Sequence, residues 1–563
     1  MDGQRLFLGK VPDDFNASTD VAIAPWCFLG REDDFDSWRT LPFSSPFDSE
    51  DEQKLEAHRC HQLYYTLLSE HINIFVGQYP GTPAVYWERT LGPWLFVTIC
   101  MAWSRYLLLD KFFITHGAKK LTTFIVSKNQ RVQLDSMEQF THLIMRSTSF
   151  NHWLVSRLVE AMAPSCLTLI QLPEESQGWE MQSPPPVPHL PSKGLKKRLK
   201  DWVNLAVTPL SGSSFIERAI LAINLYLCPK RQPMEQGARI DLKENLGFPQ
   251  IFLDLLPSLL VETLPLSLRK APPATKVGRP WLRIRLPDCW SDEERRHNAW
   301  AQSQGVRFAF AQHGGNYGVS VPYSGPPQFE YGADAFLTWG WTRHSPYKGN
   351  NFIPLPCPML GRLRNRHSAK IDGALLISSM SCAQFDGIFW PQTGNSIIEY
   401  ICQKERLIKL LNDHGFPFQY RPFLFEEQTA RFEKWFAKRN ANLRTVNGSL
   451  WQRALESKLI ILDHYSTPFH EALVTNVPTI CLWGPQTPGV CREAKPIFEK
   501  LRACGVICDT PEVLVETVVR VWPNLQDWWQ GAELQGARQE FCQNYALSSR
   551  WWLYEWTLKM RKI

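Results

Sequence analysis

The fold of this chain is decided by the stretch Leu459-Ile-Ile-Leu-Asp-His-Tyr-Ser-Thr-Pro-Phe-His-Glu-Ala-Leu473, which is followed by Asn476-Val-Pro-Thr-Ile480. Its opening apolar residues predict a buried strand, and a polar turn follows them. Pro468 suits the first position of a helix, where its missing N–H leaves no hydrogen bond unmade. The apolar run Thr479–Leu482 then predicts a second strand. A strand, a helix and a strand in this order form a parallel βαβ unit.

The same alternation extends along the chain on both sides of this unit. Short apolar runs predict further strands at 5–9, 21–29, 166–172, 306–311, 335–339, 374–378 and 418–422. Helical patterning predicts helices at 51–74, 85–110, 151–162, 291–304, 393–412, 494–504 and 511–521. This alternation favours an α/β fold with parallel sheets. We therefore expect two Rossmann-like domains that face a cleft, at 1–365 and 372–525, and a helical tail at 526–563 that packs back across them.

Composition excludes several classes of protein. A chain of 563 residues is too long for one hydrophobic core, and 44% hydrophobic with 21% charged residues is typical of globular proteins. The net charge of +6 is too small to indicate nucleic-acid binding. The 14 cysteines are scattered, with no paired CxxC motif for zinc, so we expect reduced thiols and a reducing compartment.

No segment of the sequence is expected to cross a membrane. The first residues, MDGQRLFLGK, lack the apolar core of a signal peptide. The most hydrophobic window, Trp94–Leu109, is interrupted by Arg105 and is too short to span a bilayer. We therefore expect a cytoplasmic protein. The basic run Lys193-Gly-Leu-Lys-Lys-Arg-Leu-Lys200 leads into an amphipathic helix, which could lie on anionic lipid or simply be solvated.

The turn before Pro468 is the main candidate for a binding site. Free backbone N–H groups at a helix start, together with the hydroxyls of Ser466 and Thr467, predict a phosphate site that the helix dipole favours. Glu471, one turn further on, could accept hydrogen bonds from a ribose or sugar hydroxyl. The alternative is that Thr467 only caps the helix and Glu471 only stabilises its dipole. The position at the carboxyl end of a predicted parallel strand favours the binding site.

A second candidate is the loop Gln312-His-Gly-Gly-Asn-Tyr-Gly318 after a predicted strand. Gly314 and Gly315 would let a ligand approach the backbone closely. His313 could act as a general base or contact a donor phosphate, because its charge can change near neutral pH. A purely structural turn is the alternative. Asp334 and the pair Trp339-Gly-Trp341 follow soon after and could line the same cleft, with Asp334 in an acidic role.

Three more residues are candidates for the site. Arg421 ends a predicted strand, where its guanidinium could pair with a donor phosphate or lie at the surface without a role. Ser379, after the strand predicted at 374–378, could face the nucleotide. Glu88 lies in the segment Tyr86-Trp-Glu-Arg-Thr-Leu-Gly-Pro-Trp-Leu95. It could form an ion pair with Arg89 that only orients the amino-terminal domain, and the alternatives are acceptor binding and an acidic role.

Several motifs of other nucleotide-using and metal-using enzymes are missing from the sequence. It contains no GxxxxGK[ST] loop, no GxGxxG fingerprint and no HExxH. We therefore expect a mechanism without a metal ion, in which helix dipoles and basic side chains neutralise a departing phosphate. No cofactor is expected beyond a nucleotide-linked co-substrate.

With these motifs in view, the chain resembles a family of transferases encoded in bacterial O-antigen and related surface-polysaccharide loci. The resemblance rests on the order and spacing of Phe7-Leu8, Trp26-Cys27, Arg89–Leu95, Ser149–Leu154, Gln312–Gly318, Trp339–Trp341 and Asp463–Glu471. The carboxyl half is also similar to the GT-B glycosyltransferases that transfer the 2-keto sugar Kdo from its CMP form. There, Ser466-Thr467 and Glu471 would match the cytidylate-binding segment. Arg421-Pro422 stands where those enzymes usually have His-Pro.

These resemblances imply a metal-independent GT-B glycosyltransferase. The donor would be a nucleotide sugar, such as CMP-linked Kdo or a nonulosonate, and the acceptor a glycan or lipid-linked glycan of a surface polysaccharide. The amino-terminal domain would hold the acceptor, and the enzyme could associate peripherally with the inner membrane. Two alternatives stay open: a polyol-phosphate transferase of the teichoic-acid type, and a non-catalytic glycan-binding protein that uses some of the 23 tryptophans as sugar platforms.

Overall fold

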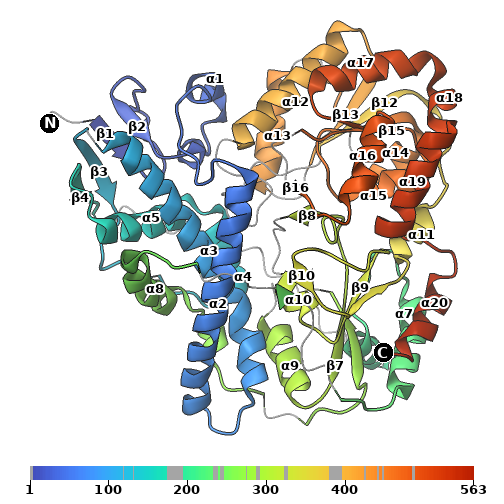
Figure 1. The fold of residues 1–563 in the computed structure, drawn as a ribbon, viewed down its shortest axis with the longest axis horizontal. Coiled ribbons are helices and arrows are strands. Elements are labelled where there is room, and N and C mark those ends of the chain that lie inside the picture. Colours follow the sequence, from blue (N-terminus) through green and yellow to red (C-terminus); the bar gives the residue numbers. More distant parts are fainter. Residues whose placement is uncertain are drawn as a thin grey trace.

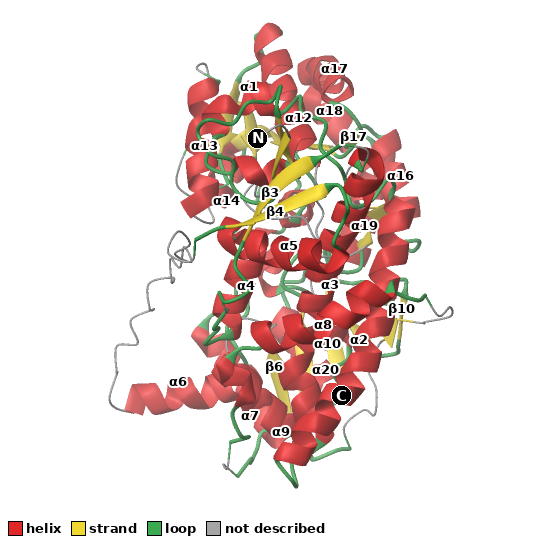
Figure 2. Ribbon diagram, turned by 90° about the vertical axis from the view of Figure 1, so that its left-hand side faces the viewer, coloured by secondary structure: helices red, strands yellow, loops and turns green. Residues whose placement is uncertain are grey.

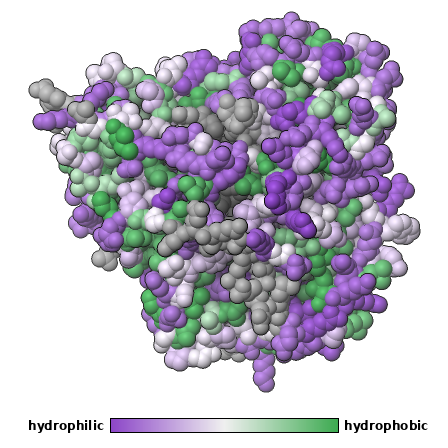
Figure 3. Space-filling view, in the orientation of Figure 1, coloured by the Kyte–Doolittle hydropathy of each residue, from purple (hydrophilic) through white to green (hydrophobic). Residues whose placement is uncertain are grey.

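The computed structural model describes residues 4–117, 119–130, 132–173, 195–232, 239–240, 246–273, 276–286, 292–321, 327–378, 396–423, 427–440, 443–446, 449–484 and 489–563. Three larger sheets organise this part of the chain, and all of their strand pairs are parallel (Figure 1). The prediction of an α/β fold with parallel sheets is therefore confirmed. On the face seen in Figure 1, hydrophilic residues predominate and hydrophobic residues gather only in scattered patches (Figure 3).

The first sheet lies at the amino terminus and has the strand order β2-β1-β3-β4. Its strands are β1 (Gln4–Phe7), β2 (Asp20–Ala22), β3 (Leu121–Ile125) and β4 (Leu167–Gln171). The apolar run at 21–29 forms only the short strand β2 and then the 3₁₀ helix η1 (Pro25–Phe28). Pro25 explains this correction, because proline has no N–H with which to continue a strand ladder.

Long helices separate this sheet from the rest of the molecule (Figure 1). They are α2 (Glu50–Gln78) and α3 (Ala84–His116), with α4 (Met137–Arg146), α5 (Thr148–Met162) and α8 (Gln250–Thr263) nearby. Within the described ranges, α3 is the one helix long and apolar enough to cross a membrane, but 89% of its apolar window is buried inside the protein. Arg105 fits this buried helix because its Nε donates to Oδ1 of Asn151, at 2.7 Å.

The middle sheet has the order β11-β9-β7-β6. Its strands are β6 (Leu282–Arg285), β7 (Arg307–Ala311), β9 (Ala335–Thr338) and β11 (Phe352–Pro354). Helices α6 (Leu195–Ala206), α7 (Phe215–Leu227), α9 (Asp292–Ser303), α10 (Pro327–Tyr331) and α11 (Pro358–Leu363) accompany it. Residues 1–365 therefore hold two separate parallel sheets, where the sequence predicted one Rossmann-like unit. The domain boundaries stay predictions.

The carboxyl-terminal sheet has the order β13-β12-β14-β15-β17. Its strands are β12 (Ile371–Ile377), β13 (Phe418–Arg421), β14 (Ser457–Leu462), β15 (Thr479–Leu482) and β17 (Ile507–Cys508). Helices α12 (Ser396–Asp413), α13 (Glu427–Arg439), α14 (Leu450–Glu456), α15 (Thr467–Thr475), α16 (Lys495–Ala503) and α17 (Pro511–Val521) flank it. The strand, turn and helix predicted from 459 to 475 are present.

The middle and carboxyl-terminal sheets are joined by backbone pairing and by the end of the chain. Strand β8 (Ser320–Val321) pairs antiparallel with β16 (Gly489–Val490). After α18 (Leu525–Gln530), helix α19 (Ala532–Tyr545) packs against α15 and α16, whereas α20 (Trp552–Met560) packs against α7. The remaining short elements are η2 (Glu32–Asp34), α1 (Phe35–Trp38), β5 (Arg239–Ile240), η4 (Leu266–Arg269), β10 (Tyr347–Lys348) and η5 (Trp522–Asn524).

Candidate functional site

The two strongest sequence motifs meet in the structure. The glycine-rich loop follows the carboxyl end of β7, and the Ser466-Thr467 turn follows the carboxyl end of β14. The backbone N–H of Gly315 donates a hydrogen bond to Oγ1 of Thr467, at 3.0 Å. The hydroxyl of Tyr465 donates to the carbonyl oxygen of Gly315, at 3.1 Å. The ends of two different sheets therefore build one continuous site.

Helix α15 begins at this site with an extended serine. Ser466 is the N-cap residue, with φ −164° and ψ −168°, and its side chain makes no capping hydrogen bond. Its Oγ is buried and has no hydrogen-bond partner among the described residues. The alternative that Thr467 caps the helix is wrong, because Thr467 is the first helical residue and its hydroxyl binds Gly315. An unpartnered hydroxyl at a helix start suits an anionic ligand.

The glycine-rich loop is held in place by its first residue, Gln312, whose contacts the motif did not reveal. Oε1 of Gln312 accepts hydrogen bonds from the backbone N–H of Trp339 and from Nε1 of Trp341, both at 2.8 Å. Its Nε2 donates to the carbonyl oxygen of Gly314, at 2.8 Å. The loop therefore has a fixed shape before any ligand arrives.

The glycines of this loop serve close contacts within the protein. A Cβ atom on Gly315 would lie 2.3 Å from Nδ1 of His470, and one on Gly314 would lie 3.4 Å from Oγ1 of Thr467. Because its N–H already binds Thr467, Gly315 has no backbone donor left for a donor phosphate. We therefore assign Gly315 to loop contact with α15 rather than to ligand binding.

His313 lies on the exposed side of the loop. Its Nδ1 is 3.2 Å from the hydroxyl of Tyr317. Although the side chain is exposed, protein surrounds it on several sides, and this reduced hydration lowers the pKa of His313 below its usual 6.5. The imidazole is therefore neutral at pH 7. When Nδ1 carries the proton and donates to Tyr317, Nε2 is the nitrogen that can accept a proton.

Glu471 lies on the first turns of α15 and is buried. Burial raises the pKa of its carboxyl group to about 8, and no hydrogen bond with a described residue opposes that effect. The charged form of Glu471 also contributes to the raised pKa of the Cys357 thiol, which lies just before α11. The carboxyl group is therefore mostly protonated at neutral pH and can donate a hydrogen bond.

Arg421 lies on the same edge of the sheet but further along it. It pairs with Ile377 of β12, and Ile377 pairs with Leu462 of β14. Two strand spacings, roughly 10 Å, therefore separate Arg421 from the start of the turn before α15. Its Nη1 donates to the carbonyl oxygen of Pro422, at 3.0 Å. A ligand that extends along this edge could reach both Arg421 and the turn.

Asp334 does not lie in the cleft where its place in the sequence predicted it. It directly precedes β9, so it lies at the amino end of the sheet, opposite to the glycine-rich loop. Its Oδ2 accepts a hydrogen bond from the backbone N–H of Phe308, at 2.9 Å. The expected place of Asp334 in the same cleft as His313 is therefore wrong, and the contact indicates a structural role.

Glu88 lies on α3, in the helical layer between the sheets. Its neighbour Arg89 donates hydrogen bonds to the carbonyl oxygens of Phe329, at 3.1 Å, and Gly332, at 2.7 Å. These contacts connect α3 to α10 and to the segment just before β9, whereas the ion pair of Glu88 with Arg89 stays a prediction. The predicted role of Ser379 lies outside the described residues.

A buried charged cluster beneath the carboxyl edge was also missed. Nζ of Lys404 lies 3.1 Å from Oε1 of Glu433, 2.8 Å from Oγ of Ser378 and 3.7 Å from Oδ2 of Asp463. The hydroxyl of Tyr400 donates to Asp463, at 2.7 Å. Ser378 and Asp463 directly follow β12 and β14, so the cluster fixes the start of both turns. A signal was present: Lys404 falls among the core positions Tyr400, Ile401, Leu407, Ile408 and Leu411 of α12.

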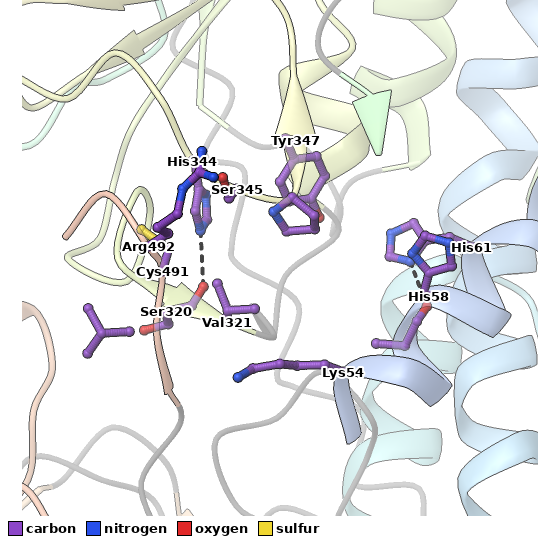
Figure 4. Close-up of a pocket in the computed structure, with 13 residues that line it drawn as sticks. Lys54, His58, His61, Ser320, Val321, His344, Ser345, Tyr347, Cys491 and Arg492 are labelled. Carbon is purple, nitrogen blue, oxygen red and sulfur yellow. Dashed lines mark hydrogen bonds between the residues drawn. The ribbon is translucent and has the colours of Figure 1, made fainter. Parts of the chain in front are cut away.

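A cavity of about 340 Å³ opens where α2 faces the β8–β16 pair. Figure 4 shows His58 and His61 of α2 on one side and His344 on the other, with Lys54 below them. Nε2 of His344 lies 3.1 Å from the carbonyl oxygen of Ser320, and burial lowers the pKa of His344 to about 4. This volume is in the range of small-molecule sites. The cavity is therefore large enough to hold a small molecule.

Within the described ranges, no group of three or more His, Cys, Asp or Glu side chains is placed to hold a metal ion.

Comparisons with known proteins bear on this site. A model of the family described as "LIC12162 family transferase" matches residues 4–560. No curated protein gives a significant match. Among solved structures, MurG of Acinetobacter baumannii shows 13% sequence identity, over 48% of this chain and 71% of that one, with a TM-score of 0.28. A score this low carries no argument about fold or function.

Proposed function

The chain belongs to the LIC12162 family of transferases, and from this premise we propose that it is a glycosyltransferase that uses a nucleotide-activated sugar. The observation that supports this proposal is the contact between the glycine-rich loop and the start of α15. It brings an exposed histidine, a helix N-terminus and a protonated carboxyl group to the carboxyl edges of two parallel sheets. Such edges are where α/β proteins bind nucleotides.

In this proposal the donor lies on the carboxyl-terminal sheet. Its phosphate meets the start of α15 and the unpartnered hydroxyl of Ser466, where the helix dipole favours negative charge. Arg421 contacts the same phosphate or its neighbour along the edge. The protonated Glu471 donates a hydrogen bond to a ribose or sugar oxygen. The start of α15, the Ser466 hydroxyl and Arg421 together neutralise the leaving phosphate without a metal ion.

The chemical step needs one proton acceptor. The hydroxyl oxygen of the acceptor attacks the anomeric carbon, and the bond from that carbon to the phosphate oxygen breaks. The electron pair leaves with the nucleotide phosphate, and the hydroxyl proton moves to Nε2 of His313. In its neutral form the imidazole of His313 has a nitrogen that can accept this proton.

The class of acceptor is inferred from the residues that line the cavity beside α2. We assign the cavity beside Lys54, His58 and Arg492 to a glycan or lipid-linked glycan, because these side chains supply hydrogen-bond donors and positive charge. The donor we favour is CMP-linked, as for Kdo or a nonulosonate, in a bacterial surface-polysaccharide pathway. The enzyme would act in the cytoplasm.

Thermal unfolding in the presence of nucleotides tests this proposal. CMP at a concentration about 100 times its Kd should stabilise the folded protein by about 2.7 kcal/mol and raise the midpoint. Ser466→Ala and Glu471→Gln, tested separately, should each weaken this effect. Glu516→Gln, at an exposed position on α17, is the matched control.

Other outcomes would redirect or refute the proposal. A shift with UDP or GDP instead of CMP would change the donor but keep the site. A shift with CDP-linked polyols would favour a polyol-phosphate transferase. No shift with any nucleotide, together with binding to finished polysaccharide, would refute it in favour of a glycan-binding protein.

A further inference from the structure

Three helices form a layer on the middle sheet, and α7 lies between the other two. Helix α7 packs against α6 and against α20, which are far apart in the sequence (Figures 1 and 2). Their inner sides share one hydrophobic core with the sheet, through residues such as Leu221 of α7 and Trp556 of α20. The outer sides of the same helices are therefore left facing solvent.

The outer side of α7 is aliphatic. Ile216, Ile220, Ile223 and Leu227 are 71%, 41%, 52% and 70% exposed. They are spaced i, i+4, i+7 and i+11, which places them along one side of the helix. The opposite side carries the buried residues of the core. A continuous row of large exposed aliphatic residues indicates a surface that a protein partner or a membrane covers.

Helix α20 continues this surface with aromatic side chains. Trp551 and Tyr554 are 75% and 63% exposed, and Leu558 is 44% exposed. Their spacing of i, i+3 and i+7 again places them on one side of the helix. Tryptophan and tyrosine favour the boundary between water and lipid, because one end of each side chain is polar and the rest is apolar.

Helix α6 and the end of α20 carry positive charges. Their exposed cations are Lys197, Arg198 and Lys200 of α6 and Lys559, Arg561 and Lys562 at the end of α20. The acidic residues on these helices are fewer. Asp201 of α6 is exposed, Glu555 of α20 is half-buried, and Glu217 of α7 pairs with Arg362, at 2.8 Å.

We propose that the exposed outer side of α7 and α20, with the cations of α6, binds the surface of an anionic lipid bilayer. The aliphatic row and the aromatic residues enter the boundary region, and the cations meet the lipid headgroups. A second copy of the chain fits this surface less well, because its own cations would face the same cations. The inference does not depend on the proposed function, since it uses none of the site residues.

Flotation of the full chain with lipid vesicles tests this inference. The protein should bind vesicles that contain phosphatidylglycerol and leave vesicles of pure phosphatidylcholine unbound. Ile220→Ser with Ile223→Ser, and Trp551→Ser with Tyr554→Ser, should each weaken binding by about tenfold or more, because apolar area is lost from the boundary region. Replacing Lys197, Arg198 and Lys200 by Gln should weaken it and reduce its sensitivity to salt.

The matched control is Val513→Ser with Val519→Ser on α17, where both valines are also exposed, at 47% and 41%. This control should bind vesicles like the wild type. Because all substituted residues are exposed, thermal midpoints should stay unchanged. Absence of binding to anionic vesicles, or equal binding by the α7 variant and the control, would overturn the inference. So would a dimer in sedimentation experiments that the α7 substitutions dissociate, since this surface would then contact a second copy.

Discussion

The carboxyl group of Glu471 lies where water hardly reaches it. Burial raises its pKa from 4.5 to about 8 in the folded protein. In the unfolded chain the same group ionises near its usual pKa. Between these two pH values the folded protein holds more protons than the unfolded chain. The free energy of unfolding must therefore fall as the pH rises through this range.

Replacing Glu471 with Gln removes this dependence on pH. For the wild type, this one group should lower the free energy of unfolding between about pH 5 and pH 8, with a slope of at most about 1.4 kcal/mol per pH unit. Glu471→Gln should give a flatter profile over the same range. Urea unfolding at several pH values measures both. Glu516→Gln should follow the wild type, and equal slopes for all three proteins would mean that Glu471 is ionised in the folded state.

Single residues could be predicted from the sequence where the signal is local. Ser466 and Thr467 follow directly from a strand, a turn and a proline, and the structure has that order. Asp334 was misplaced because a short sequence distance was equated with proximity, although β9 runs between it and the turn at Trp339. The loop contacts of Gln312 depend on two tryptophans of another loop, so no local pattern could reveal them.

At the scale of elements, α12 is tied to the carboxyl-terminal sheet by one buried lysine. The side chains of Lys404 and Asp463 have no exposed surface, and that of Glu433 is only 1% exposed. Removing the ammonium group would leave two carboxylates buried without their cation. A buried charge that loses its partner destabilises a protein by about 3–5 kcal/mol.

Lys404→Met should therefore lower the free energy of unfolding by about 3–5 kcal/mol. The double variant with Glu433→Gln should recover part of that loss, because one uncompensated charge is removed. Chemical denaturation measures these values. Lys409→Met on the same helix is the control, since Lys409 pairs with Asp413 at the surface and should change stability by less than about 1 kcal/mol. Equal effects of the two lysine variants would contradict the role of the cluster.

The apolar strands of the carboxyl-terminal βαβ unit were predicted at their positions, whereas a strand with charged residues was missed. The strands β14 and β15 are runs of buried residues and match their predicted positions. Strand β6 was missed because its sequence is Leu-Arg-Ile-Arg, although all of its residues are buried. Arg285 tolerates this burial because its Nη2 donates to the carbonyl oxygen of Leu205, at 2.7 Å. Tertiary contacts of this kind leave no trace in a hydropathy pattern.

At the scale of the whole molecule, the end of the chain connects two sheets that the sequence separates. The backbone N–H of Leu547 donates to the carbonyl oxygen of Trp339, at 2.8 Å, and that of Cys357 donates to Leu547, at 2.9 Å. Helix α19 lies on the carboxyl-terminal side and α20 on the middle sheet. The sequence predicted a helical tail that packs back across the domains. It did not predict two separate sheets within 1–365, because that division depends on which strands pair, and pairing is not encoded in the local sequence.

Two tryptophans of the tail distinguish this connecting role from the proposed membrane surface. Trp556 is 3% exposed and its Nε1 donates to the carbonyl oxygen of Pro356, at 2.9 Å, whereas Trp551 is 75% exposed. Trp556→Ala should lower the free energy of unfolding by about 3–5 kcal/mol, because it leaves a cavity in the core beneath α20. Trp551→Ala should change stability by less than about 0.5 kcal/mol but weaken vesicle binding. Denaturant unfolding and vesicle flotation of the same two variants separate the effect on stability from the effect on membrane binding. A large loss of stability in Trp551→Ala would mean that α20 contacts more of the protein than its exposed side indicates.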